Sequence, residues 1–251
     1  MTTPDTMEKI LALDGVDFVE KAVSQGRIAD PLLADALAPG SSFFEQFRVL
    51  RAKVRAIGNE RPFQCVGILS AGPSEGRTTV AVGLALALAE ERRRVLLIEA
   101  ELRDPVLAPA LGLVPNGGLS NWLRAEGARP VPIRRLEPSG LRVLAGGSRV
   151  AAPAELLGGE RMAKLLEVTR RSFDYVVVDC PPLVPLADTL GLQHFLDGAL
   201  LVVRARHSFQ DTILRAHAHL KPNLVAGVVF NDQREIVTRR LGRRDRLPPP
   251  G

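Results

Sequence analysis

The segment Ser70–Thr79 (Ser-Ala-Gly-Pro-Ser-Glu-Gly-Arg-Thr-Thr) joins an apolar run that predicts a strand to an Ala/Leu-rich run that predicts a helix. At such a junction, successive backbone N–H groups and a helix N-terminus can hold phosphate. The usual Gly-Lys-Ser/Thr ending supplies a lysine to the phosphates and a hydroxyl to magnesium. Gly76 and Thr78 fit this ending, but Arg77 replaces the lysine and Ala71 the first glycine. Alone, the loop is equally consistent with a plain turn. The residues expected to line a phosphate site are Gly72, Ser74, Glu75, Gly76, Arg77, Thr78 and Thr79.

Acidic residues follow two other predicted strands. Asp179 ends the apolar run Tyr175–Asp179, where a carboxylate would orient magnesium and water. Glu99 and Glu101 follow the run Val95–Ile98. Ligands of open parallel sheets bind at the carboxyl ends of the strands, so these acids are expected beside the loop. One carboxylate at a strand end is common on protein surfaces. The loop and the acids together follow three separate strands, and this joint placement favours a nucleotide site over a plain turn.

The pattern of the whole chain predicts an α/β fold, with a mostly parallel sheet and helices on both faces. The predicted strands are Gln64–Ser70, Val95–Ile98, Leu141–Leu144, Tyr175–Asp179, Gly198–Val203 and Leu224–Phe230. The predicted helices are Ser41–Ile57 (capped by Ser41 or Ser42), Thr78–Glu90, Arg161–Arg171 and Gln210–Leu220. We expect an accessory, helical N-terminal arm over residues 1–40, a P-loop domain over 41–233 and a basic, Pro-rich, disordered tail over 234–251.

Composition excludes several classes of protein. With 46% hydrophobic and 24% charged residues, the chain has the composition of a globular protein. No apolar run approaches the ~20 residues of a membrane span, and Met1–Glu8 lacks the basic segment of a secretory signal. Cys65 and Cys180 lie far apart in apolar runs, which predicts buried free thiols in a reducing compartment. We therefore expect a cytoplasmic protein.

The charge of the chain is concentrated in the tail. The arginines there are Arg239, Arg240, Arg243, Arg244 and Arg246. Such a segment is most often solvated, and weak attraction to anionic lipid or nucleic acid is the alternative. No aromatic residue separates these arginines, which argues against a groove for single-stranded nucleic acid.

Three motifs surround the candidate residues. They are Pro73-Ser74-Glu75-Gly76-Arg77-Thr78, Ile98-Glu99-Ala100-Glu101-Leu102-Arg103-Asp104-Pro105 and Asp174-Tyr175-Val176-Val177-Val178-Asp179-Cys180-Pro181-Pro182. Together they resemble the cytoplasmic ATP-binding domain of the bacterial tyrosine kinase family, whose first two motifs read P-G-E-G-K-S/T and I-D-A-D-L-R-R-P. That family regulates capsule and exopolysaccharide synthesis and belongs to the ParA/MinD-like deviant-Walker ATPases. The resemblance runs from about Ser41 to Asp232.

The resemblance implies ATP or ADP with Mg²⁺ as the ligand. The implied metal site is Thr78, Glu99 and Asp179, and the implied catalytic residues are Arg77, Glu99, Glu101 and Asp179. Asn231, after the last strand, corresponds to residues that contact adenine in relatives, although a plain strand-ending turn is equally consistent.

The predicted helix Ser41–Ile57 contains a further match. Its segment Glu45-Gln46-Phe47-Arg48-Val49-Leu50-Arg51 is similar to the E-x-x-R-x-x-R oligomerisation element of the family. Glu45, Arg48 and Arg51 share roughly one helix face and are implied to contact a second copy. The alternative is a solvated charged stripe.

The departures from the family pattern fall on catalytic positions. Arg77 presents a wide planar fork where a lysine presents a compact charge. Glu99 and Glu101 each add a methylene to an aspartate, which displaces groups around a metal that demands near-ideal octahedral geometry. Tyr175 is the one tyrosine, so the tail lacks the tyrosine cluster that such kinases phosphorylate. The sequence therefore predicts that the nucleotide site is retained and its catalysis impaired.

Three hypotheses follow. The leading one is a kinase-like, nucleotide-binding regulator that assembles with the cytoplasmic segment of a membrane chain-length or export protein, at the inner face of the membrane. The second is an active tyrosine kinase that uses ATP. The third is a ParA/MinD-like positioning ATPase, which is disfavoured because Ala71-Gly72-Pro73 lacks the early lysine usual in that group.

Overall fold

The computed structural model describes residues 8–13, 16–23, 28, 30–36, 38, 40–114, 117–184 and 188–232. The predicted tail over 234–251 lies outside these residues, as does part of the predicted N-terminal arm.

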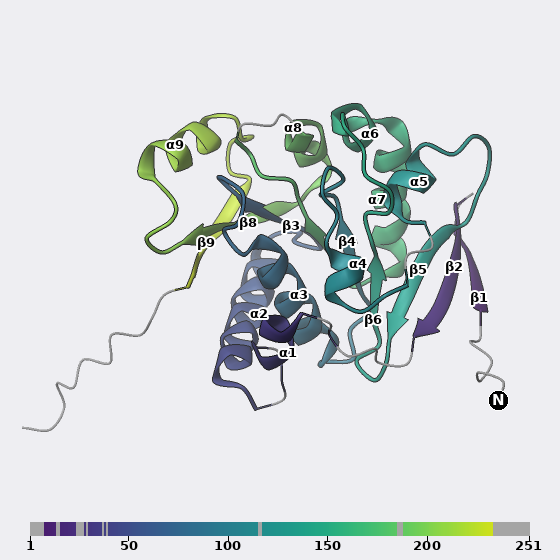
Figure 1. Cartoon of the computed structure of the whole chain (residues 1–251), viewed down its shortest axis with the longest axis horizontal. Helices are drawn as coiled ribbons and strands as arrows, with labels where there is room; N and C mark the ends of the chain where they lie inside the picture. The colour runs from purple at the N-terminus through teal and green to yellow at the C-terminus, as the bar shows by residue number, and fades with distance from the viewer. Residues whose placement is uncertain are drawn as a thin grey trace, which may run out of the picture.

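One large sheet organises the described part of the chain (Figure 1). Its nine strands are β1 (Glu8–Leu13), β2 (Val16–Val23), β3 (Cys65–Ser70), β4 (Val95–Glu99), β5 (Val131–Leu136), β6 (Leu141–Leu144), β7 (Tyr175–Asp179), β8 (Gly198–Arg204) and β9 (Val225–Asn231). Their order is β1-β2-β5-β6-β4-β7-β3-β8-β9. All neighbours are parallel except the pairs β1–β2 and β5–β6. The predicted α/β fold with a mostly parallel sheet is confirmed.

Helices cover both faces of the sheet (Figure 1). They are α1 (Pro31–Ala36), α2 (Ser42–Glu60), α3 (Arg77–Ala89), α4 (Leu107–Ala110), α5 (Leu119–Leu123), α6 (Ala154–Gly158), α7 (Glu160–Ser172), α8 (Asp188–Leu192), the 3₁₀ turn η1 (Gln193–Phe195) and α9 (Gln210–Ala218). Alternate strand residues enter two separate cores, so that Val66 and Ile68 pack with α2 and α3 while Cys65 and Leu69 pack with α7. None of the described helices is long and apolar enough to cross a bilayer.

The helix α2 has the start that the sequence predicts. The Ser41 hydroxyl accepts hydrogen bonds from the backbone N–H groups of Phe43 and Phe44, at 3.2 and 3.3 Å. A serine at this position satisfies N–H groups that have no partner within the helix. Phe44 and Phe47 are buried, which seats α2 against the α3 side of the sheet.

The prediction of a helical N-terminal arm is wrong for much of residues 8–23, which form β1 and β2 instead. β2 extends the sheet through parallel pairing with β5, which was also missed. The buried side of β2 includes Glu20, a charged residue that interrupts the apolar alternation expected of a strand. Glu20 is tolerated there because Arg142 and Arg135 approach its carboxylate, at 2.5 and 3.2 Å.

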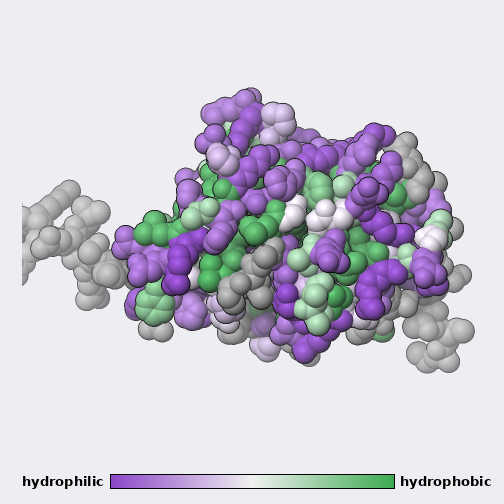
Figure 2. Space-filling model, turned by 90° about the horizontal axis from the view of Figure 1, so that it is seen from above, coloured by the Kyte–Doolittle hydropathy of each residue, from purple (hydrophilic) through white to green (hydrophobic). Residues whose placement is uncertain are grey.

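The sheet ends at β9, whose outer edge no described strand covers. Large apolar side chains are exposed on β9 and at α9; these are Val228 and Phe230 on β9 and Phe209 and Leu214 at α9. Figure 2 shows apolar surface among hydrophilic residues on the face seen from above. β3, β4 and β7 lie at the centre of the sheet, where all their residues except Tyr175 are buried, and these three strands carry the candidate site.

Candidate functional site

The loop between β3 and α3 has the backbone shape of an anion cradle. Ser74 and Gly76 both adopt positive φ, at 58° and 85°. Gly76 is the N-cap of α3 and offers no side-chain cap. The first N–H groups of α3 therefore have no acceptor within the helix, and the positive end of the helix dipole faces the same space. This arrangement suits the phosphates of a nucleotide.

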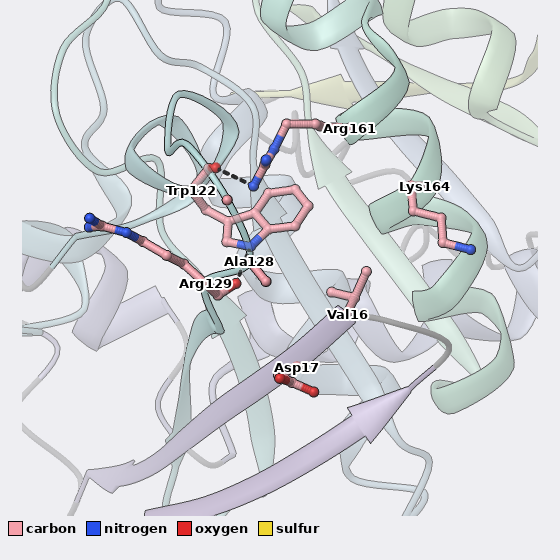
Figure 3. Close-up of a pocket in the computed structure, with 8 residues that line it drawn as sticks. Val16, Asp17, Trp122, Ala128, Arg129, Arg161 and Lys164 are labelled. Carbon is pink, nitrogen blue, oxygen red and sulfur yellow. Dashed lines mark hydrogen bonds between the residues drawn. The ribbon is translucent and has the colours of Figure 1, made fainter.

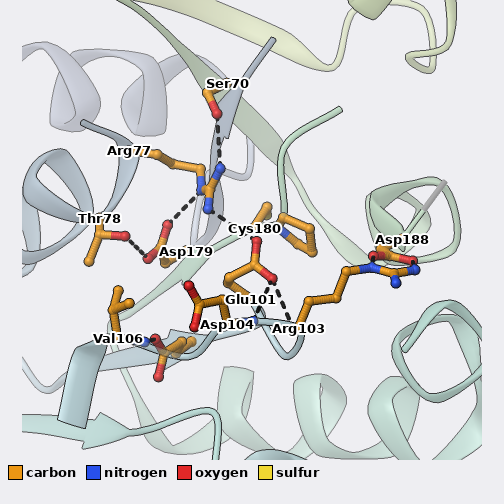
Figure 4. Close-up of polar contacts among 12 residues, drawn as sticks. Ser70, Arg77, Thr78, Glu101, Arg103, Asp104, Val106, Asp179, Cys180 and Asp188 are labelled. Carbon is orange, nitrogen blue, oxygen red and sulfur yellow. Dashed lines mark hydrogen bonds and ion pairs between the residues drawn. The ribbon is translucent and has the colours of Figure 1, made fainter. Parts of the chain in front are cut away.

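The side chain of Arg77 points back into the sheet edge (Figure 4). Its Nε donates to Asp179 Oδ1 at 2.9 Å and its Nη1 to Ser70 Oγ at 2.9 Å. Its Nη2 lies 3.5 Å from Glu101 Oε2. Arg77 is 9% exposed, so the guanidinium is a buried cation held by groups at the ends of β3 and β7 and after β4.

Asp179 has both carboxylate oxygen atoms engaged. Oδ1 accepts from Arg77, and Oδ2 accepts from the Thr78 hydroxyl at 2.7 Å. Its side chain is completely buried. The structure thus brings together the predicted residues Arg77, Thr78 and Asp179, in the place that the sequence indicates.

Glu99 lies in register with Asp179 on the neighbouring strand, but its carboxylate binds backbone N–H groups and not Arg77 or Thr78. Oε1 accepts from the N–H groups of Val106 and Leu107 at 2.6 and 2.7 Å, and Oε2 accepts from Gly146 at 2.7 Å. Burial raises the pKa of Glu99 to about 7, against the opposing effect of these N–H groups. In this arrangement Glu99 fixes the start of α4 and the loop after β6, and coordinating a metal would require it to release backbone groups.

Glu101 connects the site to a second ion pair. Its Oε1 accepts from the N–H of Arg103 at 3.0 Å, and burial raises the pKa of its carboxyl despite the nearby Arg77. Arg103 in turn donates two hydrogen bonds to the buried Asp188, at 2.5 and 3.0 Å. Asp188 and Ser70 support the site but were not predicted from the sequence. Asp188 acts through Arg103, which is 85 residues away, and Ser70 acts through the side chain of Arg77.

The loop is also tied to the last two strands. Asn231 Nδ2 donates to the carbonyl oxygen of Glu75 at 2.9 Å, and Arg204 Nη1 donates to that of Ser74 at 3.1 Å. Glu75 is itself buried, and its Oε1 accepts from the N–H of Gly72 at 3.1 Å. Asn231 therefore lies at the predicted site, where it supports the loop; Arg204 was not among the predicted residues.

Whether these residues suit Mg²⁺ can be tested from their contacts. Mg²⁺ requires near-octahedral oxygen coordination and keeps several waters. The Asp179 carboxylate is completely buried and already accepts from Arg77 and Thr78, and Glu99 is engaged by backbone N–H groups. Within the described residues, no group of three or more His, Cys, Asp or Glu side chains is placed to hold a metal. The arrangement does not fit a hydrated Mg²⁺, whereas the backbone cradle fits phosphate.

The implied oligomerisation residues are engaged within the chain. Arg48 donates to Glu90 from Nε and Nη2, at 3.0 and 2.8 Å, and also pairs with Glu45. Arg51 donates to the carbonyl oxygen of Ala87 at 2.7 Å and lies 3.2 Å from Glu90. These contacts fasten α2 to the end of α3. The implied contact with a second copy stays a prediction.

A small hollow lies away from the loop, between the start of β2, the segment after α5 and α7 (Figure 3). The guanidinium of Arg161 stacks over the Trp122 ring, 4.6 Å from its centroid, and donates to the Trp122 carbonyl oxygen at 3.0 Å. Figure 3 shows the Arg129 side chain pointing away, so that only its carbonyl, which accepts from Trp122 Nε1, faces the ring. The stacked arginine covers one face of the ring and stabilises the packing of α5 on α7.

Known proteins are similar to most of this chain in sequence. No model of a known protein family matches the chain. The tyrosine-protein kinase YwqD of Bacillus subtilis (strain 168) is 30% identical over 198 residues, which cover 78% of this chain and 84% of YwqD. The succinoglycan biosynthesis transport protein ExoP of Rhizobium meliloti (strain 1021) is 34% identical over 200 residues, 77% of this chain but 25% of ExoP.

Solved structures of related proteins have a similar fold. The kinase domain of the Escherichia coli tyrosine kinase ETK superposes with a TM-score of 0.72 and 26% identity, covering 79% of each chain. The cell division ATPase MinD of Pyrococcus furiosus superposes with a TM-score of 0.53 and 26% identity, over 66% of this chain and 70% of MinD. The sheet, the loop after β3 and the helix that follows it thus belong to a P-loop architecture.

Proposed function

The chain belongs to the bacterial tyrosine-protein kinase family, and from this premise we propose that it is a kinase-like, nucleotide-binding regulator of capsule or exopolysaccharide biosynthesis whose ATP turnover is slow or absent. The observation that carries the proposal is the position of Arg77. The guanidinium of the residue that replaces the phosphate-binding lysine is displaced onto Asp179, Ser70 and Glu101, where Thr78 and Asp179 would otherwise hold a metal ion. Phosphoryl transfer depends on positioning and on charge placed at the transferred group, so this displacement lowers turnover more than binding.

The link to polysaccharide synthesis rests on the relatives. ExoP is by name a succinoglycan biosynthesis transport protein, and this chain corresponds to a quarter of its length. By analogy, we propose that this chain works beside the cytoplasmic segment of a membrane chain-length or export protein, at the inner face of the membrane. Homo-oligomerisation through Glu45, Arg48 and Arg51 belongs to the same proposal.

The test combines binding with turnover. Calorimetry with ATP and with ADP is expected to give saturable binding by the wild-type chain, and labelled ATP is expected to give little or no phosphotyrosine on a tyrosine-bearing partner. Arg77→Lys, which restores the compact cation of an active site, is expected to raise turnover at similar affinity. Arg124→Lys, at an exposed position, is the matched control.

Two outcomes would overturn the proposal. Wild-type phosphotyrosine formation that Asp179→Ala abolishes would instead identify an active tyrosine kinase. Failure of both nucleotides to bind at millimolar concentration would leave a protein that acts by assembly alone.

A further inference from the structure

Arg77 is the cation that pairs with both Asp179 and Glu101 at the sheet edge. Arg77 Nε and Asp179 Oδ1 are 2.9 Å apart, and Arg77 Nη2 and Glu101 Oε2 are 3.5 Å apart. The side chains of Arg77 and Glu101 are 10% and 12% exposed, and that of Asp179 is completely buried. A charge-assisted pair under such burial holds its partners strongly, because separating them leaves an unpaired charge away from water.

The oxygen atoms that a divalent cation would need already accept hydrogen bonds. Thr78 Oγ1 donates to Asp179 Oδ2 at 2.7 Å, and the other oxygen of Asp179 accepts from Arg77. Glu99 is fully buried and accepts from three backbone N–H groups. A hydrated cation would have to displace the guanidinium from Asp179 and also shed most of its water, which Mg²⁺ does reluctantly.

The start of α3 can hold phosphate without a metal. The first turn of α3 directs N–H groups and the positive end of its dipole at the space above Gly76. Arg204, at the end of β8, reaches the same loop through the carbonyl oxygen of Ser74. Phosphate groups can therefore be held by backbone donors, with two arginines of the chain beside them: Arg77, paired with Asp179, and Arg204, which lies 3.2 Å from Asp232.

From these contacts we propose that Arg77 takes the place of a divalent cation at this site, so that the chain binds nucleoside di- and triphosphates without Mg²⁺. The proposal rests on the proposed nucleotide binding and specifies its ligand as the metal-free nucleotide. In this proposal Arg77 also excludes the metal. Replacing its guanidinium with the lysine ammonium frees an oxygen of Asp179 and makes nucleotide binding depend on Mg²⁺.

The experiment is calorimetric titration of wild-type chain and Arg77→Lys with ADP and with ATP, in MgCl₂ and in EDTA at matched ionic strength. The wild-type Kd is expected to agree between the two buffers within about threefold, and the Arg77→Lys Kd to fall by about tenfold or more when Mg²⁺ is present. Mn²⁺ alone, followed by electron paramagnetic resonance, is expected to show no bound ion in the wild-type chain. Arg124→Lys is expected to behave as wild type in every arm.

The outcomes separate this inference from the proposed function. If Mg²⁺ tightens wild-type binding by tenfold or more, or if Mn²⁺ binds the wild-type chain alone, Arg77 does not replace the metal, although nucleotide binding stands. If neither nucleotide binds in either buffer, both the proposed nucleotide function and this inference are wrong. If Arg77→Lys does not fold, the wild-type comparison and the Mn²⁺ measurement still decide between Arg77 and the metal.

Discussion

The side-chain amide of Asn231 both holds the loop between β3 and α3 and fills the space that any side chain on Gly76 would need. Its Nδ2 donates to the Glu75 carbonyl oxygen at 2.9 Å and lies 1.9 Å from the position of a Cβ on Gly76. We expect Gly76→Ala to lower the free energy of unfolding by about 2 kcal/mol or more, from the collision and the positive φ together. Asn231→Ala removes one hydrogen bond, which costs about 1 kcal/mol.

A double-mutant cycle in urea checks this relationship. Gly76→Ala with Asn231→Ala is expected to cost less than the sum of the two, because loss of the amide relieves the collision. Gly127→Ala is the matched control: its φ is also positive, at 75°, but nothing lies within 4 Å of its Cβ position. Strictly additive costs at Gly76 and Asn231 would contradict the contact.

Removal of the Arg77 charge is expected to destabilise the fold. Arg77→Met leaves the buried Asp179 carboxylate with only the Thr78 hydroxyl, and loss of one partner from a buried pair costs about 3–5 kcal/mol. Adding Asp179→Asn is expected to recover part of this loss, since the unpaired charge is then gone. Urea unfolding measures both, with Arg124→Met as the exposed control. An Arg77→Met cost equal to that of Arg124→Met would show that the pair does not form.

Stability is expected to depend on pH through Glu99. Burial raises its pKa from 4.5 to about 7 in the folded chain, so the folded state holds the proton more tightly than the unfolded state. The free energy of unfolding should then fall as pH rises from 4.5 to 7, with at most about 3 kcal/mol attributable to this group. Glu99→Gln should remove that share of the slope when unfolding is measured at pH 5 and pH 7.5. Glu126→Gln, at an exposed position, should leave the pH dependence of unfolding as in wild type. An unchanged slope in Glu99→Gln would contradict a raised pKa at Glu99.

The site and the fold differed in how far sequence could predict them. The positions of Arg77 and Asp179 at one sheet edge follow from apolar strands that end in polar residues, a local pattern. The hydrogen bonds of Glu99 do not follow from a local pattern, because Gly146 lies 47 residues away and contributes only a backbone N–H. The motif predicts a metal ligand at Glu99, and the structure adds that this carboxylate accepts hydrogen bonds from backbone N–H groups of two segments.

The strands that were missed have a similar cause. β5 reads Val-Pro-Ile-Arg-Arg-Leu, in which proline and arginine break the composition of a strand, although Val131 and Ile133 are buried. β2 buries Glu20, whose ion-pair partner Arg142 is 122 residues away. Strands that depend on distant partners for a buried charge are not visible in local periodicity.

Charge changes in the ion pairs between α2 and the end of α3 are expected to have small effects on stability, and a charge change at Glu45 of α2 a larger effect on assembly. The side chains of Arg48 and Glu90 are 34% and 36% exposed, so Glu90→Gln should cost less than about 1 kcal/mol, and less still in high salt. The Glu45 side chain is 53% exposed and is the member of the motif most open to a second copy. We expect Glu45→Lys to shift sedimentation toward the monomer with little change in unfolding. Unchanged sedimentation of an oligomeric chain would exclude Glu45 from the interface.

Two glycines in neighbouring helices should respond in opposite ways to alanine. A Cβ on Gly83 of α3 would lie 2.5 Å from the ring of Phe47 in α2, which is 5% exposed and has little room to move. Gly83→Ala is therefore expected to destabilise by about 1–3 kcal/mol, despite the better helix propensity of alanine. Gly58 near the end of α2 has open space at its Cβ position, so Gly58→Ala should stabilise by up to about 1 kcal/mol. Phe47→Leu should rescue part of the Gly83→Ala loss in urea unfolding. If both alanines stabilised the chain, α2 would not pack on α3 through Phe47.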